Sequence, residues 1–302
     1  MRIGITGATG FLARHLLLHA HQHERVAYSR SAQPWPVLLA DEILRVPADA
    51  PHAVPETRLD ALVHLAGESL MGFWTQSKKQ RIWKSRVDLT ASLIAQLRSW
   101  RAENRPRVLI CASGAGFYGN RGEESLDEYA AAGEGFLAKL CVAWENAAQE
   151  AAALGIRVIT LRTGMVLGED GGAFPLLRRV FRLGLGGRLG SGQQWMPWIH
   201  VEDAARLILH ALDTQSMHGP LNLVAPQAVT NAVFTQTLAT VLHRPAFCHV
   251  PAAVLRGALP GMAEEMLLPS TRVLPRIATE SGYTFAHPQL QGALTSLWQS
   301  GT

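Results

Sequence analysis

Short apolar runs alternate with longer amphipathic stretches along the first half of the chain. The amphipathic stretches, such as residues 81–100 and 138–153, place apolar residues three or four positions apart, as in a helix with one buried face. The apolar runs have the composition of buried strands, and they lie at residues 2–6, 26–28, 61–66, 108–112 and 158–161. Strands that alternate with helices predict an α/β fold with a doubly wound parallel sheet, which binds ligands at the carboxyl ends of its strands.

This alternation stops after about residue 165. Residues 183–194 are rich in glycine, and they precede an amphipathic stretch, a short apolar run at 221–224 and several helical stretches with many prolines. We therefore expect one domain over residues 1–165 and a smaller, mostly helical domain over 166–302, which closes over the edge of the sheet as a substrate domain or lid. Residues of about 199–224 are expected to return a helix and a strand to the first domain.

A glycine-containing turn follows the first predicted strand. Residues 6–13 read TGATGFLA, a GxxGxxA version of the fingerprint that binds the pyrophosphate of a dinucleotide. Glycines permit the tight turn and let backbone N–H groups approach the pyrophosphate, which lies at the positive end of the following helix. Because the turn follows a strand and opens a helix, it predicts a dinucleotide-binding Rossmann domain.

The end of the second predicted strand indicates which dinucleotide is bound. An NAD site places an Asp or Glu there to accept a hydrogen bond from the ribose 2′-hydroxyl. This strand instead ends in Ser29, Arg30 and Ser31. An arginine pairs with the 2′-phosphate of NADP(H) through charge-assisted hydrogen bonds, so NADP(H) is the expected cofactor. The alternative is that Arg30 is a solvent-exposed loop cation.

Composition narrows the class of protein further. The 302 residues, 48% hydrophobic and 17% charged, fit one large or two closely packed globular domains. No apolar stretch approaches the ~20 residues of a membrane span, and no signal peptide is evident, so we expect a cytoplasmic protein without a membrane partner. The net charge is +4, but the Lys and Arg are scattered, which argues against a nucleic-acid partner. The oligomeric state stays open between monomer and homodimer.

The cysteines and histidines form no metal or disulfide pattern. Cys111, Cys141 and Cys248 are widely spaced, and the twelve histidines lack an HExxH-type spacing. We expect buried cysteines and no metal site.

Several motifs occur in an order that is typical of one group of proteins. They read TGATGFL, HLAGE, SRVDLT, ASGAGFYG, LRTGMVLG and WIHVEDAA, and they start at residues 6, 64, 85, 112, 161 and 198. This order resembles the extended, epimerase-like short-chain dehydrogenase/reductases. The segments GEGFLAKLCVAWE, LGLGGRLGSGQQWMPWIHVED and VPAAVLRGALPGMAEEMLL are similar to an atypical subgroup of NADP-binding epimerase-family proteins, which has a small C-terminal domain of unknown function and some members once labelled cell-division inhibitors.

The resemblance implies cofactor-binding residues one at a time. Those implied at the pyrophosphate and the adenosine are Gly7, Thr9, Gly10, Phe11, Leu12, Ser29 and Arg30. Those implied along the rest of the cofactor, toward its nicotinamide, are Leu65, Ala66, Gly67, Arg86, Ala112, Thr163, Gly164 and Met165. For Arg86 the alternative is a helix-surface arginine paired with Asp88 or Glu68.

The resemblance also implies a tyrosine that this chain lacks. Typical superfamily members use a Ser or Thr together with a Tyr-x-x-x-Lys pair, in which the phenol exchanges a proton with the substrate. With Lys139 as the lysine, the tyrosine position is Gly135; aligned on the following Trp-Glu, the lysine position is Cys141 and the tyrosine position is Leu137. Neither alignment supplies a phenol.

Three other residues are candidates for catalysis. Ser113 lies at or within one residue of the superfamily's catalytic hydroxyl, although it could instead bind nicotinamide or cap local backbone. Tyr118 could lie near the substrate, with a structural or binding role as the alternative. Glu68 ends the apolar run 61–66 at the expected cleft, where partial burial could raise its pKa toward neutrality; alternatively it orients Arg86.

The expected substrate side lies in the second domain. By resemblance, Gln194, Trp195, Trp198 and His200 cross the cleft, where the indole rings could stack on a flat ligand. The alternative is that the tryptophans pack the hinge between the domains. These expectations together predict an NADP(H)-binding, epimerase-like oxidoreductase with an atypical active site and an unknown small polar or nucleotide-linked substrate. The alternative function is a non-catalytic NADP(H)-binding sensor or regulatory module.

Overall fold

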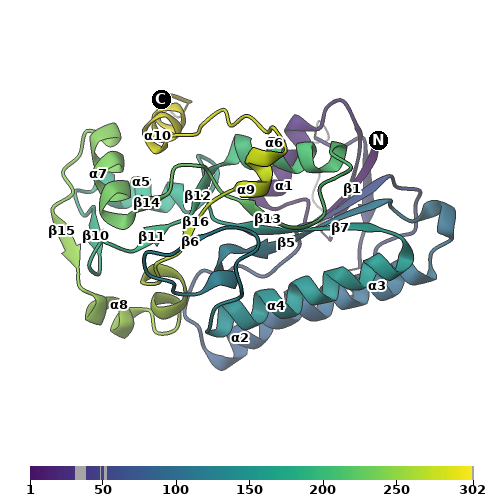
Figure 1. The fold of residues 1–302 in the computed structure, drawn as a ribbon, viewed down its shortest axis with the longest axis horizontal. Coiled ribbons are helices and arrows are strands. Elements are labelled where there is room, and N and C mark those ends of the chain that lie inside the picture. The colour runs from purple at the N-terminus through teal and green to yellow at the C-terminus, as the bar shows by residue number, and fades with distance from the viewer. Residues whose placement is uncertain (31–38, 48, 51–52, 301–302) are drawn as a thin grey trace.

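The computed structural model describes residues 1–30, 39–47, 49–50 and 53–300. Figure 1 shows a central sheet with helices on both faces, and the later part of the chain gathered at one end of it (left). Within the described residues, no helix combines the length and the apolar character that crossing a bilayer requires.

The central sheet has seven strands, all parallel, in the order β13-β7-β5-β4-β1-β2-β3. Their bounds are β1 Arg2–Thr6, β2 Glu24–Ser29, β3 Glu42–Arg45, β4 Ala61–His64, β5 Val108–Gly114, β7 Arg157–Thr163 and β13 Gly219–Leu223. The strand order reverses between β1 and β4, which is where an open α/β sheet forms a ligand crevice at its carboxyl edge. The predicted doubly wound parallel sheet is confirmed.

Helices cover both faces of this sheet. α1 (Phe11–His19) and α6 (Val201–Asp213) pack on one face, and α3 (Leu89–Ser99) and α4 (Phe136–Gln149) pack on the other. Successive residues of a strand point to opposite faces, so most residues of the central strands are buried under one helical layer or the other. This burial explains why these strands read as continuous apolar runs.

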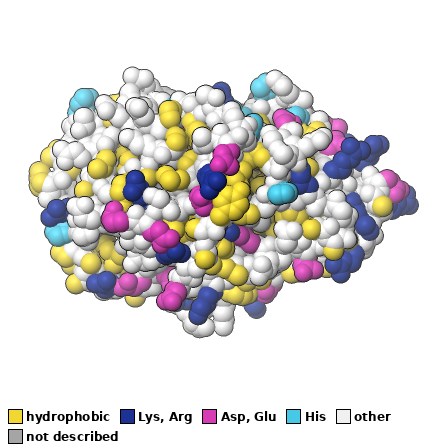
Figure 2. Space-filling model, viewed as in Figure 1, with side chains coloured by type: hydrophobic (Ala, Val, Ile, Leu, Met, Phe, Trp, Pro, Cys, Tyr) yellow, Lys and Arg dark blue, Asp and Glu magenta, His cyan; other side chains and the backbone are white. Residues whose placement is uncertain are grey.

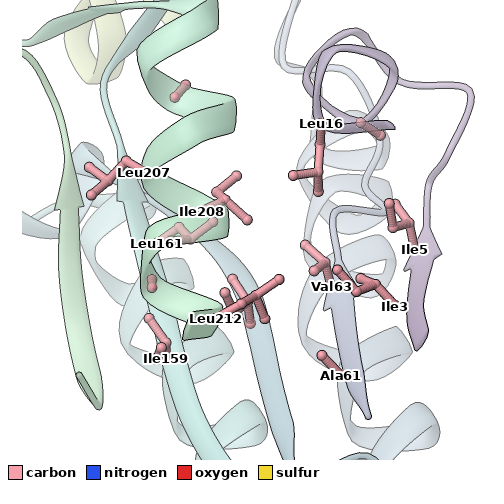
Figure 3. Packing of buried hydrophobic residues seen from close by; sticks show 14 of the residues in the cluster. Ile3, Ile5, Leu16, Ala61, Val63, Ile159, Leu161, Leu207, Ile208 and Leu212 are labelled. Atoms are coloured by element: carbon pink, nitrogen blue, oxygen red, sulfur yellow. The ribbon is translucent and has the colours of Figure 1, made fainter. Parts of the chain in front are cut away.

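Figure 3 shows part of the core under α1 and α6. The labelled side chains converge from the two helices and from three strands, and they are Ile3, Ile5, Leu16, Ala61, Val63, Ile159, Leu161, Leu207, Ile208 and Leu212. α6 thus packs on the central sheet, although it follows the glycine-rich segment in the sequence.

A π-helical turn interrupts one long helix at the sheet's other face. α2 (Gln76–Trp83) passes through this turn, Lys84–Asp88, into α3. Single π turns within α-helices are rare and frequently lie at functional sites. Arg86 lies in the middle of the turn, and no feature of the apolar periodicity predicted it.

The later part of the chain forms a second core from helices and short strands. Its helices are α5 Phe174–Arg182, α7 Asn231–Leu242, α8 Ala252–Ala258, α9 Arg276–Glu280 and α10 Leu290–Ser300. Its small sheets contain β8 Met165–Gly168, β9 Gly171–Gly172, β10 Gly187–Leu189, β11 Trp195–Met196, β12 Trp198–His200, β14 Val229–Thr230, β15 Cys248–Val250 and β16 Arg272–Val273. One further strand of these sheets, β6 Ser125–Leu126, comes from the earlier part of the chain. β6 pairs with β16, so the two parts of the chain share one of these sheets.

Charged side chains are mixed over the face that Figure 2 shows. Lys and Arg gather mainly at one end (right), with Asp and Glu beside them, and apolar side chains spread over the middle.

Candidate functional site

The glycine turn lies at the carboxyl edge of the sheet, where the strand order reverses. Gly7 has a φ of 65°, and its carbonyl accepts a hydrogen bond from the Gly10 N–H at 2.8 Å. A Cβ atom on Gly7 would lie 2.7 Å from the backbone nitrogen of Ala66, so the turn fits against the loop after β4 only with glycine here. Thr9 and Gly10 are exposed, and no described side chain caps the first turn of α1. The N–H groups that begin α1 are therefore open to an anionic group.

Phe11 and Leu12 direct their side chains into packing. A Cβ atom on Gly168 or Gly171 would lie 2.4 or 2.5 Å from the Phe11 ring, so the ring fills the space above these two glycines. Leu12 packs against the core under α1. Both residues can meet a cofactor through backbone N–H groups rather than through their side chains.

The end of β2 lies beside the end of β1, where Tyr28 pairs with Thr6. Ser29 is buried and Arg30 is exposed, while Ser31 lies outside the described residues. The exposure of the Arg30 guanidinium is consistent with binding of a 2′-phosphate at this edge, and it is equally consistent with a loop cation that binds no ligand.

Two side chains that the sequence analysis did not single out join the ends of β1 and β4. Thr6 Oγ1 and His64 Nδ1 lie 2.6 Å apart, and both residues are buried. Burial lowers the pKa of His64 to about 4, so its ring is neutral at physiological pH. Leu65, Ala66 and Gly67 follow this pair directly, and the pair fixes where their loop begins.

The Arg86 side chain reaches from the π turn to this loop. A Cβ atom on Gly67 would lie 3.3 Å from the Arg86 Cζ, and the guanidinium also lies 5.3 Å from the centre of the Trp144 ring. Arg86 is 9% exposed, and its NH1 donates only at 3.3 and 3.5 Å, to Ser85 Oγ and the Ile82 carbonyl. The alternative of a surface arginine paired with an acid is therefore wrong.

Glu68 forms an ion pair instead of an acid–base centre. Its carboxylate accepts a hydrogen bond from Lys78 Nζ at 2.8 Å, and its side chain is 39% exposed. Lys78 lowers the pKa of Glu68 below its usual value. The raised pKa that the sequence analysis expected is thus wrong, because the lysine supplies a charge partner that the apolar run before Glu68 did not reveal.

Ser113 takes part in a buried polar network. Its hydroxyl donates to Glu145 Oε1 at 2.8 Å, and the same carboxylate accepts two hydrogen bonds from Arg162, each at 2.9 Å. The Glu145 and Arg162 side chains are 13% and 5% exposed. Because the Ser113 proton is directed to Glu145, the remaining lone pairs of this hydroxyl can only accept hydrogen bonds.

Tyr118 lies deeper in the same network. Its hydroxyl donates to Asn222 Oδ1 at 2.7 Å and accepts from Arg162 NH1 at 3.0 Å, and the residue has no exposed surface. Burial raises the pKa of Tyr118 to about 12. A phenol in this position cannot reach a substrate in the cleft, so the geometry favours the structural role that the sequence left as the alternative.

The packing of α4 shows which of its residues face β5, where the Tyr and Lys of the superfamily would be expected. A Cβ atom on Gly116 would lie 3.0 Å from the Leu137 Cβ, and a Cβ atom on Gly114 would lie 3.8 Å from the Cys141 sulfur. Leu137 and Cys141 therefore face the carboxyl end of β5, one helical turn apart, whereas Lys139 is exposed on the other side of α4. In the alignment on Trp-Glu, these two residues stand at the expected positions of the usual Tyr and Lys, so the packing favours that alignment over the one on Lys139.

Cys111 and Cys141 are expected to be unreactive thiols in the folded protein. Burial raises the pKa of Cys111 to about 12 and that of Cys141 to about 11, so neither forms a thiolate near neutral pH. With an excess of a coloured disulfide reagent at neutral pH, only Cys248, which is partly exposed, should react quickly. A second thiol that reacts at the same rate before unfolding would contradict this assignment, and full reaction in denaturant is the control.

The residues expected near the nicotinamide lie along the ends of β5 and β7. Ala112 packs partly buried against the core under α3 and α4. The Gly164 N–H donates to the Leu223 carbonyl at 3.2 Å, and the Met165 N–H donates to the Pro197 carbonyl at 2.8 Å. Thr163 donates its hydroxyl to the backbone. This turn is therefore held between the end of β13 and the segment that leads through β12 into α6.

Three of the four residues expected on the substrate side, Gln194, Trp198 and His200, are buried. Trp198 is 1% exposed and donates its indole N–H to the Gln227 carbonyl at 2.8 Å. Gln194 is buried and donates to the carbonyls of Leu189 and Leu267. Stacking of Trp198 on a ligand is thus wrong for this structure, and the alternative of hinge packing describes it better.

Trp195 has a partly exposed ring in a charged setting. Its indole N–H donates to Glu123 at 2.7 Å, and the Arg272 guanidinium lies 4.6 Å from the ring centre. It is the one member of the four expected substrate-side residues whose ring is still accessible in the described structure.

His200 belongs to a cluster of possible metal ligands at the start of α6. His200, Glu202 and His287 place possible metal-ligand atoms within 4.8 Å of one another. However, His200 Nδ1 already accepts a hydrogen bond from the Glu202 N–H, and burial lowers the pKa of His200 to about 3. A neutral imidazole has a single basic lone pair, so the geometry favours a hydrogen-bonded helix cap over a metal site.

A pocket of about 620 Å³ opens between the sheet unit and the later part of the chain. It is lined by the segments after β5 and before α4, which include Gly116 and Gly135, and by Glu264 and Glu265. Glu265 accepts hydrogen bonds from the first N–H groups of α4 at 2.8 and 3.0 Å, which ties the later part of the chain to the helix that carries Leu137.

Comparison with known proteins agrees with this architecture. The NAD dependent epimerase/dehydratase family matches residues 3–223, and a domain of unknown function, DUF1731, matches residues 250–297. Epimerase family protein YfhF of Bacillus subtilis is 36% identical over 303 residues, covering 98% of each chain. Human epimerase family protein SDR39U1 is 35% identical over 303 residues, covering 98% of this chain and 99% of the human protein.

Solved structures show the same relationship. A crystal structure of human epimerase family protein SDR39U1 (isoform 2) with NADPH has a TM-score of 0.87 and 34% identity, and the alignment covers 99% of each chain. UDP-glucose 4-epimerase of Thermus thermophilus in complex with NAD has a TM-score of 0.77 at 17% identity, and this likeness shows a shared fold. The chain therefore belongs to the NAD dependent epimerase/dehydratase family and carries a C-terminal DUF1731 domain, as the resemblance predicted.

Proposed function

We propose that this protein binds NADP(H) at the carboxyl edge of its sheet and acts as an epimerase-like oxidoreductase of atypical mechanism on a small polar substrate. The observation that carries the proposal is the uncapped start of α1, which Gly7 and Gly10 place at the point where the strand order reverses. The NADPH in the human relative, which aligns over 99% of this chain, supports the same cofactor here.

Residues of this chain are proposed to form the binding site of this cofactor. NADP(H) would contribute hydride transfer, and the chain would bind, orient and shield it. The open N–H groups at the start of α1 suit its pyrophosphate, and Arg30 suits its 2′-phosphate. The other residues proposed to line it are Thr9, Phe11, Leu12, Ser29, Leu65, Ala66, Gly67, Arg86, Ala112, Thr163, Gly164 and Met165.

Arg30→Asp should weaken NADPH much more than NADH. The guanidinium favours the 2′-phosphate and a carboxylate repels it, so we expect NADPH affinity to fall roughly tenfold or more. Titration of the bound nicotinamide's fluorescence measures both affinities. Arg98→Asp, which makes the same charge change at an exposed site on α3, is the control. If Arg30→Asp leaves both affinities unchanged, the 2′-phosphate assignment is wrong.

The charge of the pocket favours a small polar substrate over a nucleotide-linked one. Glu134, Glu264 and Glu265 line it, and its arginine, Arg121, already pairs with Glu124 at 2.7 Å. A nucleoside diphosphate would bring two further negative charges into this setting, whereas a hydroxylated or amine-bearing substrate would meet hydrogen-bond acceptors. Ser113, at the carboxyl end of β5 rather than in the lining of this pocket, would offer the substrate a further acceptor, because its own proton is directed to Glu145.

The second candidate function is an NADP(H)-binding sensor, and α4 is the observation that favours it. Leu137 and Cys141 fill the usual acid–base positions, while Glu265 ties the later part of the chain to the same helix. The deciding experiment follows NADPH absorbance against a panel of carbonyl and quinone compounds. Turnover that Ser113→Ala abolishes would support the enzyme; tight NADPH binding without turnover on the whole panel would support the sensor.

A further inference from the structure

A second pocket lies in the later part of the chain, apart from the proposed cofactor and substrate sites. It has a volume of about 810 Å³ and is bounded by α7, β10, β15 and the segment between α7 and β15. Figure 1 shows these elements together at one end of the molecule (left), whereas β1 lies toward the other end. The described residues that line this pocket are all different from those proposed to bind NADP(H), so its ligand can be tested independently of the proposed function.

The charge of this second pocket is positive. Arg188 and Arg244 line it together with His243 and His249, and no Asp or Glu lines it among the described residues. Arg188 and His249 are register partners in the parallel pair of β10 with β15, so they lie on the same face of this small sheet. Neither guanidinium forms an ion pair with a described residue, and Arg244 donates only to the His243 carbonyl, at 3.3 Å. The pocket therefore offers unneutralised positive charge to an anion.

A buried hydroxyl adds a directional group to this charge. Thr235 lines the pocket from α7 and is 6% exposed, yet its hydroxyl has no hydrogen-bond partner among the described residues. Buried polar side chains in folded proteins are normally hydrogen-bonded, so an oxygen atom of a ligand would complete the bonding of this hydroxyl. The start of α7 is held in place, since the Asn231 side chain accepts a hydrogen bond from the Leu189 N–H of β10 at 2.8 Å.

Part of the wall of this pocket is apolar. Ala232, Ala239, Ala246 and Phe247 line it, and Phe247 is 79% exposed. An exposed aromatic ring beside basic groups can pack against the organic part of a ligand while the basic groups bind its anionic part. The pocket thus suits a ligand that has both parts.

We propose that this pocket binds a small organic phosphate. Arg188 and Arg244 pair with the phosphate oxygens, and Thr235 donates a hydrogen bond to one of them. Phe247 packs against the organic part. A phosphate group suits these donors better than a carboxylate, because it brings up to two negative charges and three acceptor oxygens. The pocket of about 620 Å³ beside α4 is lined by glutamates and would repel the same anion, so charge distinguishes the two pockets.

The experiment measures the binding of phenyl phosphate, inorganic phosphate and phenol by titration calorimetry, in a buffer free of phosphate and sulfate. Phenyl phosphate should bind most tightly, because it alone combines the two parts. Arg188→Gln and Arg244→Gln should each weaken its binding about tenfold or more, the range for a lost hydrogen bond to a charged group. Arg98→Gln, the same change at an exposed site on α3, is the matched control and should leave the affinity unchanged.

Two further variants test the hydroxyl and the ring. Thr235→Val should weaken phenyl phosphate and inorganic phosphate alike, by roughly threefold. Phe247→Ala should weaken phenyl phosphate by roughly threefold and leave inorganic phosphate unchanged. Circular dichroism checks that each variant is folded. The side chains of Arg188 and Phe247 are exposed, so these two variants test the proposal even if Thr235→Val fails to fold.

Arg30→Gln distinguishes this site from the cofactor site. Phosphate bound at the proposed 2′-phosphate site would be lost in Arg30→Gln and kept in Arg188→Gln, and this result would overturn the proposal. Absence of phenyl phosphate binding would overturn it as well. Equal affinities for phenyl phosphate and inorganic phosphate, unchanged in Phe247→Ala, would show an adventitious ion only and would also overturn it. Binding that Arg188→Gln removes and Arg30→Gln preserves supports the proposal, whether or not the protein binds NADPH.

Discussion

Gly7→Ala is expected to eliminate measurable NADP(H) binding. The Gly7 φ of 65° is unfavourable for alanine by about 1–2 kcal/mol. The larger effect is steric, because the new Cβ would lie 2.7 Å from the Ala66 nitrogen and 2.8 Å from the carbonyl carbon of Leu65. The glycine turn and the loop after β4 would have to separate, and this moves the open N–H groups of α1 away from the pyrophosphate site. Titration with NADPH measures the loss.

Gly155→Ala is the matched control for this prediction. Gly155 also has a positive φ, 76°, but a Cβ there would meet no atom within 4 Å. This variant should lose roughly 1 kcal/mol of stability and keep its NADPH affinity. If both variants bind NADPH like the parent, the glycine turn is not the pyrophosphate site.

Glu145→Ala is expected to destabilise the fold by roughly 3–5 kcal/mol, because it leaves the Arg162 guanidinium buried without its carboxylate. For a chain of this size the Tm should fall by roughly 10 °C. The loss also removes the acceptor of the Ser113 hydroxyl at 2.8 Å, so Ser113 would no longer present its lone pairs in a fixed direction. Thermal unfolding followed by circular dichroism measures the change.

The control for Glu145 is an ion pair of the same geometry on the surface. Arg121 donates to both carboxylate oxygens of Glu124 at 2.9 and 2.7 Å, but the Glu124 side chain is 51% exposed. Glu124→Ala should cost less than about 1 kcal/mol, since solvent compensates the charge that remains. Equal losses in the two variants would show that burial does not set the strength of the Glu145–Arg162 pair.

For two of the candidate catalytic residues, partners from other segments give the side chain a setting that the sequence did not reveal. Glu68 looked like a desolvated acid because it follows an apolar run, but Lys78 lies on the next helix and holds it as an ion pair. Tyr118 looked close to the substrate, but Asn222 and Arg162 arrive from β13 and β7 and bury its hydroxyl. A linear pattern does not contain these partners, which are separated by up to 104 residues.

Local signals by themselves determined the sheet, the glycine turn and the family. Strand runs, helical periodicity and a turn that only glycine can adopt are properties of consecutive residues, so they can be read without the fold. The sequence allows either Lys139 or Cys141 at the position of the superfamily's lysine. Tertiary structure favoured Cys141, since only the packing of α4 shows that Cys141 faces β5. It also decided the environment of Arg86: the guanidinium is buried beside Gly67 and over the Trp144 ring, while Glu68 pairs with Lys78, because burial and ion pairing depend on distances between segments and not on their order in the chain.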